Sequence, residues 1–64
     1  MEPRLLKIDE ACKYLNLHPE TLYLLGRMGR ILTVRIGRAI RFDRVELDKW
    51  IEQKKLDSVQ DLKL

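Results

Sequence analysis

Residues 8–28 read IDEACKYLNLHPETLYLLGRM, which is the pattern of two short helices separated by a tight turn. Apolar side chains fall on one face of a first helix over about residues 9–16: Ile8, Ala11, Cys12 and Leu15. Pro19 suits the first position of a new helix, because that position needs no backbone N–H donor. The second helix is therefore predicted over about residues 19–28, with Gly29 as its C-terminal stop.

The second helix has two different faces. Leu22 and Leu25 form the side expected to be buried, and Gly26 between helical residues indicates close packing against a neighbour. The other side is mostly polar and is predicted to be available for contact. It carries the candidate binding residues Glu20, Thr21, Tyr23, Leu24 and Arg27, with Met28 beside them.

From residue 31 the apolar period changes from helical to alternating. Leu32, Val34 and Ile36 predict a half-buried strand, residues 37–39 a turn, and residues 40–42 a return strand. The apolar side chains of this hairpin are expected to face one way. The arginines are expected on the other face or near the tip, and all three are candidate binding residues: Arg35, Arg38 and Arg41.

A third helix has the clearest start in the chain. Asp43 and Glu46 have the spacing of a capping box, and Leu47, Trp50 and Ile51 follow at helical spacing, so that Trp50 and Ile51 are expected to close the core. The fold class predicted is mainly α with a small β-hairpin, a winged helix-turn-helix, over residues 1–54. Residues 55–64 form a tail for which a frayed helix, a disordered end and a partner-contact surface all stay open.

The positive charge is concentrated in one place. The chain has a formal net charge of +3, but residues 27–44 hold six arginines and one aspartate, a net of +5, and each flank has a net of −1. The guanidinium group presents a planar fork of donors that suits phosphate oxygens and guanine edges. A basic patch of this kind is typical of proteins that bind nucleic acid.

Composition excludes several classes of function. The 64 residues predict a single small domain, and with one cysteine, Cys12, no internal disulfide can form, which favours a reducing, cytoplasmic location. Neither a signal-peptide pattern nor an apolar run of about 20 residues is present, so a soluble protein is expected. The one histidine, His18, adjoins Pro19 in a turn. Cys12 and His18 could not hold a metal ion without two more N or S ligands, which the sequence lacks, so no metal is expected. No cofactor, no small-molecule substrate and no enzymatic activity are expected either.

The order of these elements resembles a known family over about residues 5–52, namely the excisionase-type DNA-binding proteins, which are related to MerR-type winged helices. The resemblance rests on Leu5-Leu6, Glu10-Ala11, Tyr14-Leu15, Thr21-Leu22-Tyr23, Gly29-Arg30-Ile31-Leu32, Val34-Arg35-Ile36-Gly37-Arg38, Ile40-Arg41-Phe42 and Leu47-Asp48-Lys49-Trp50. It implies binding to double-stranded DNA through the second helix and the wing. The resemblance matches Thr21, Tyr23 and Arg27 to the recognition helix, and Arg35, Arg38 and Arg41 to the wing.

The biological role implied is that of a recombination directionality factor of a mobile element or prophage, or of a small transcriptional regulator. Partners implied are an integrase or recombinase, or further copies of the chain on adjacent DNA sites. The chain departs from the family pattern at Lys7, where many members have a capping serine or threonine, and at Leu24, where many have arginine. Leu24, Met28 and the apolar tail leave a second class open, a protein-interaction module that does not bind DNA.

Overall fold

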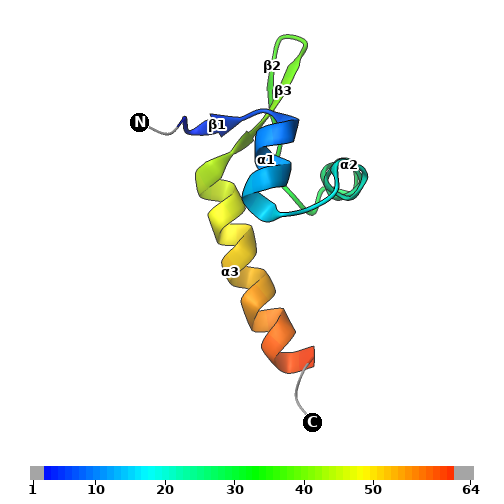
Figure 1. Cartoon of the computed structure of the whole chain (residues 1–64), viewed down its shortest axis with the longest axis vertical. Coiled ribbons are helices and arrows are strands. Elements are labelled where there is room, and N and C mark those ends of the chain that lie inside the picture. Colours follow the sequence, from blue (N-terminus) through cyan, green and yellow to red (C-terminus); the bar gives the residue numbers. More distant parts are fainter. Residues whose placement is uncertain (1–2, 62–64) are drawn as a thin grey trace.

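The structure, a computed structural model, describes the backbone of residues 3–61 and the side chains of residues 3–58. Within that range, three helices pack with a three-stranded antiparallel sheet (Figure 1). The elements in chain order are β1 (Leu5–Leu6), α1 (Ile8–Leu15), α2 (Pro19–Arg27), β2 (Val34–Ile36), β3 (Ala39–Asp43) and α3 (Arg44–Asp61). The predicted mainly helical fold with a β wing is confirmed, and the starts and ends of the first two helices lie within one residue of those predicted.

Both short helices end in a left-handed residue that reverses the chain. Asn16, at φ 56°, follows α1, and the Leu17 N–H donates to the Cys12 carbonyl oxygen at 3.0 Å. Asparagine tolerates this backbone conformation better than most residues do. Gly29, at φ 73°, follows α2 in the same way, as predicted. The two stops keep the α1–α2 connection short and direct the chain after α2 back toward the sheet.

The core lies where α1, α2 and the start of α3 meet the sheet. Its buried side chains are Leu6, Ala11, Cys12, Leu22, Ile31, Phe42 and Leu47. Ile8, Leu15, Leu25 and Trp50 are partly buried and pack against this group. Cys12 is confirmed as a core residue, and its burial raises the pKa of the thiol. Ile51 was expected to close the core with Trp50, but it is only half-buried and lies outside the core group, because α3 leaves the body of the domain at this point.

The sheet has a strand that the sequence pattern does not predict. Its order is β1-β3-β2, with Leu5 paired to Asp43 and Leu6 paired to Phe42. Two residues are too few to show an alternating pattern, so no signal in the sequence marks β1 as a strand. The pairing places Leu6 beside Phe42 in the core and ties the N-terminal segment to the strand that leads into α3.

The turn of the wing is one residue shorter than predicted, and this changes the register. Gly37–Arg38 forms a two-residue turn, Arg35 pairs with Ile40, and Val34 pairs with Arg41. A three-residue turn would have placed Arg35 opposite Arg41 on one face. Since paired residues of antiparallel strands point to the same side, Arg35 and Arg41 lie on opposite faces of the hairpin. The prediction that these two arginines share a face is wrong.

The apolar side chains of the wing are also less buried than the alternating pattern predicts. Leu32 precedes β2 and is 61% exposed, and Ile36 is 55% exposed. The tip of the hairpin extends away from the helices (Figure 1), so that only the part of β3 near Phe42 reaches the core. The wing therefore presents most of its surface to solvent.

Asp43 joins β3 to α3 and fixes the N-terminal segment. Its Oδ1 accepts the Val45 N–H at 3.0 Å, which confirms Asp43 as the cap of α3, while the Glu46 carboxylate of the predicted capping box accepts from Lys49 Nζ. Arg4 donates to both carboxylate oxygens of Asp43, from Nε at 3.2 Å and from Nη2 at 3.1 Å. This hydrogen bond from Arg4 is the main cause that holds the pKa of Asp43 below its usual value.

We expect the free energy of unfolding to fall in acid partly because Asp43 takes up a proton. A lowered pKa in the folded state gives a contribution that is full above the unfolded pKa, about 4, and is lost as pH falls through the folded value. Asp43→Asn keeps a capping oxygen but loses the ion pair, so its stability should depend less on pH below about 4. Urea unfolding of both proteins at several acidic pH values measures this. Parallel losses of stability would contradict the assignment.

Helix α3 continues without a break through residues 54 and 55 to Asp61, and its C-terminal half projects from the body of the domain (Figure 1). Ion pairs one turn apart lie along it, including Lys55 Nζ to Glu52 Oε2 at 2.8 Å. Leu56 is exposed, whereas the Val59 side chain and Leu62 lie outside the described residues. None of the helices in residues 3–61 has the length and apolar character needed to cross a bilayer.

Candidate nucleic-acid interface

One side of α2 is turned to solvent over its whole length. Pro19 occupies the first turn as predicted, and Leu22 is fully buried on the opposite side. Every candidate residue of this helix is exposed: Glu20, Thr21, Tyr23, Leu24 and Arg27. An exposed helix face with both polar and apolar side chains can reach base edges in the major groove of duplex DNA.

The arginines of the wing differ in their surroundings. Arg35 on β2 and Arg38 in the turn are exposed. Arg41 on β3 is half-buried, and its Nη1 donates to the Ile40 carbonyl oxygen at 2.9 Å. The structure therefore brings Arg35 to the α2 side of the hairpin and leaves Arg41 on the other side, with part of its donor capacity already used.

Several arginines of the central basic stretch have no partner among the described residues. Among the described residues, Arg41 makes a hydrogen bond and Arg44 has an interaction of its own, whereas no hydrogen bond or ion pair is found for the guanidinium groups of Arg27, Arg30, Arg35 and Arg38. The carboxylate of Asp43, which lies within the same stretch, is occupied by Arg4. A guanidinium without an internal acidic partner keeps its charge and donors available for a phosphate.

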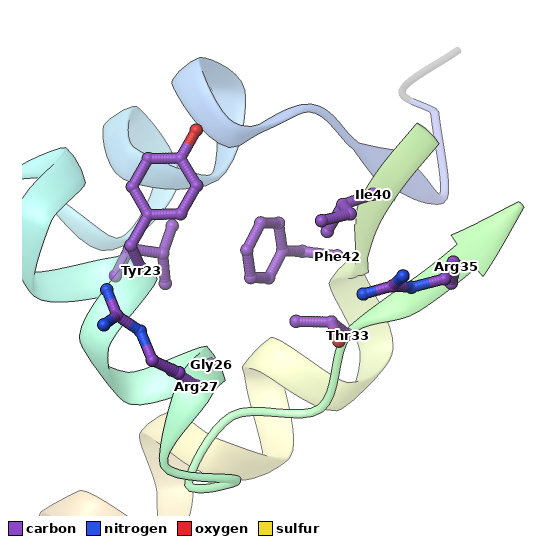
Figure 2. Close-up of a pocket in the computed structure, with 8 residues that line it drawn as sticks. Tyr23, Gly26, Arg27, Thr33, Arg35, Ile40 and Phe42 are labelled. Carbon is purple, nitrogen blue, oxygen red and sulfur yellow. The ribbon is translucent and has the colours of Figure 1, made fainter. Parts of the chain in front are cut away.

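A hollow of about 240 Å³ separates α2 from the wing (Figure 2). It is lined by Leu22, Tyr23, Gly26, Arg27, Thr33, Arg35, Ile40 and Phe42. In Figure 2, Arg27 and Tyr23 come from the α2 side, and Arg35 points toward the hollow from the opposite side. Phe42 lies between them as an apolar floor. The hollow thus combines two cations with a flat apolar surface.

Gly26 sets how closely the helix approaches the wing. A Cβ at this position would lie 3.3 Å from the Thr33 Cγ2 atom, which is tighter than an ordinary contact. This confirms the close packing that the sequence predicts for Gly26. Thr33 itself is a lining residue that the sequence analysis did not select. Its only signal is its position two residues before Arg35, which places both on one face of the strand.

Other chemistries find little support in the described residues. No group of three or more His, Cys, Asp or Glu side chains in the part of the chain that the structure describes is placed to hold a metal ion. His18 is exposed at the N-cap of α2, and its side chain makes no capping hydrogen bond there. Its position is the one that the sequence predicts for it, in the turn before Pro19.

Comparison with models of protein families identifies the family to which this chain belongs. A family model described as a helix-turn-helix domain matches residues 5–55, which include α1, α2, the wing and most of α3. Curated proteins and solved structures give no match. Since the family match covers most of the chain and agrees with the fold, this protein belongs to the helix-turn-helix family of excisionase-like DNA-binding domains.

Proposed function

We propose that this protein binds specific sites on duplex DNA, without catalysis, by placing α2 in the major groove and the wing against the adjacent backbone or minor groove. The observation that carries the proposal is the exposed face of α2 beside a hairpin on which Arg35 and Arg38 have no partner among the described residues. Arginine suits the narrow minor groove, where the negative potential is concentrated. Phosphate contacts supply most of the non-specific affinity, because each releases counterions.

The residues on α2 and those on the wing have different proposed tasks. Glu20 can accept a hydrogen bond from a cytosine amino group, and Leu24 can contact a thymine methyl group. Thr21, Tyr23 and Arg27 are proposed to contact bases or phosphates beside them. Arg35 and Arg38 are proposed to bind the backbone. Arg41 is proposed to contribute less to DNA binding, because it faces away from α2 and donates to the Ile40 carbonyl oxygen.

Arg38→Ala should weaken DNA binding and reduce the slope of log affinity against log salt by about one unit if Arg38 contacts a phosphate. Fluorescence anisotropy with a labelled duplex at several salt concentrations measures both quantities. Arg41→Ala is the matched control, because it removes the same charge from the same hairpin on the other face, and its slope should stay closer to that of the wild type. An unchanged affinity and slope in Arg38→Ala would show that the wing tip does not contact DNA.

For the biological role we propose a recombination directionality factor of a mobile element or prophage, with a small transcriptional regulator as the alternative. The excisionase-like family supports the first role. Selection from random duplexes would give the preferred site, and gel mobility with that site at different positions would measure bending. A bend together with stimulated excision by an integrase supports the directionality factor. Repression of a neighbouring promoter without any effect on excision would favour the regulator.

This proposal assigns DNA binding to residues 1–54 and leaves residues 55–64 for a partner, such as an integrase or a second copy on an adjacent site. The free protein is proposed to be a monomer, which sedimentation without DNA tests. A tight dimer under those conditions would contradict it.

A protein-interaction module without DNA binding is the second candidate. It is favoured by Leu24 on α2 and by Met28, the C-cap residue one turn later, which are 51% and 54% exposed. This candidate predicts that the arginines are dispensable and that Leu24 and Met28 are not. A folded wild-type protein with no affinity for DNA even at low salt would favour it.

A further inference from the structure

We infer that the hollow between α2 and the wing is a binding site for a single backbone phosphate of the bound DNA, and that Arg27 and Arg35 hold this phosphate from opposite sides. The inference rests on the proposed DNA binding and assigns one ligand group to a pair of residues from two elements. For Arg27, which can reach either a base or a phosphate, it selects the phosphate.

The geometry of the hollow supports a shared ligand. Arg27 stands on the last turn of α2, and Arg35 stands in the middle of β2 on the face that carries Ile40 and Phe42 (Figure 2). Both line the same space of about 240 Å³. Because of the two-residue turn of the wing, Arg35 points toward α2 rather than away from it. The close approach at Gly26 and Thr33 fixes the distance between the two elements.

The charges of the lining favour an anion. Neither Arg27 nor Arg35 has an ion pair or hydrogen bond among the described residues, and the lining of this hollow includes no carboxylate. Two other hollows on the described surface each include an acidic residue, Glu10 in one and Glu46 in the other. A carboxylate repels a phosphate, so the α2–wing hollow is the better anion site of the three.

The occupant we assign is a phosphate within a DNA strand. A helix in the major groove and a wing against the adjacent minor groove stand on either side of the sugar–phosphate ridge that separates the grooves. That ridge must then pass through the space between α2 and the wing. Tyr23 and Ile40 are exposed and give the hollow apolar walls that suit the face of a deoxyribose, while the two guanidinium groups suit the phosphate oxygens.

Single methylphosphonate substitutions along the selected duplex test this inference, because each removes the charge of one phosphate. One position should lower wild-type affinity by about five- to tenfold at about 0.1 M salt, as expected for one lost phosphate contact. At that same position, Arg27→Ala and Arg35→Ala should each lose most of the sensitivity. Arg38→Ala is the control, and it should remain sensitive there, since Arg38 lies in the turn and outside the hollow.

The outcomes separate this inference from the proposed function. If the wild type binds DNA but Arg27→Ala and Arg35→Ala remove the sensitivity to methylphosphonate at different phosphates, the two arginines do not share a phosphate, while DNA binding stands. If Arg27→Ala instead changes the preferred base at one position, and the same methylphosphonate positions still lower its affinity, Arg27 contacts a base and the shared phosphate-binding site is again contradicted. If the folded wild type does not bind DNA, both proposals fail. Circular dichroism of each variant confirms that it is folded.

Discussion

The triple variant Arg27, Arg35 and Arg38→Ala should lose nearly all affinity for duplex DNA. Each phosphate contact contributes about 0.9 to the salt slope. Because Arg27 and Arg35 are proposed to share one phosphate and Arg38 to bind another, the loss of two phosphate contacts lowers affinity by a factor of about 60 at about 0.1 M salt. The slope itself should fall by about 1.8. The three side chains are exposed and have no internal partners in the described residues, so the variant should remain folded.

A second triple variant serves as the control for net charge. Lys13, Lys49 and Lys55→Ala removes the same three positive charges, but from α1 and α3. The ion pairs of Lys49 and Lys55 are exposed, and such pairs contribute little to stability. If DNA binding depends on the surface formed by α2 and the wing, this control should keep most of its affinity. Equal losses in both variants would mean that net charge alone, rather than this surface, attracts the DNA.

Phe42→Ala should remove about half or more of the protein's free energy of unfolding and lower its melting temperature accordingly. Phe42 is fully buried and packs between the helices and the sheet, and truncation of such a side chain costs about 3–5 kcal/mol. The total stability expected for 64 residues is only about 3–10 kcal/mol. Thermal unfolding followed by circular dichroism measures the effect.

Ile36→Ala is the matched control for Phe42→Ala, because Ile36 lies on the same hairpin and is exposed. Its free energy of unfolding should change by no more than about 0.5 kcal/mol. A Phe42→Ala protein as stable as the Ile36→Ala protein would contradict the core described here.

The helices could be predicted because their signals are local. Pro19 starts α2, Gly29 ends it, and Asp43 caps α3, and each of these effects depends on the residue itself and its nearest neighbours. The role of Glu10 was missed, although its signal is also local. Its Oε1 accepts the Lys7 N–H at 2.9 Å, three residues before it, which supports the start of α1 where Lys7 supplies no capping side chain.

The sheet was harder to predict because its pairing is not local. The strand β1 has only two residues, and its partner strand lies more than thirty positions away in the sequence. No local pattern around Leu5 and Leu6 therefore predicts a strand there. The register of the wing depends on whether Ala39 belongs to the turn or to the strand. That single residue decides which face Arg35 occupies, and alternating hydrophobicity does not settle it.

The candidate interface was predictable as a list of residues but not as an arrangement. Exposure of the α2 residues follows from helical periodicity, and the concentration of arginine is visible in the composition of residues 27–44. The hollow depends on the close approach of Gly26 to Thr33 and on the register of the wing. Both are properties of packing between elements, so the pairing of Arg27 with Arg35 emerges only from the structure.

The most direct test of DNA binding is fluorescence anisotropy of the wild-type protein with a mixed-sequence duplex, titrated at several salt concentrations. We expect measurable affinity at low salt that falls steeply, and linearly on logarithmic axes, as salt rises. A protein that is folded by circular dichroism and still shows no affinity at the lowest salt would contradict it.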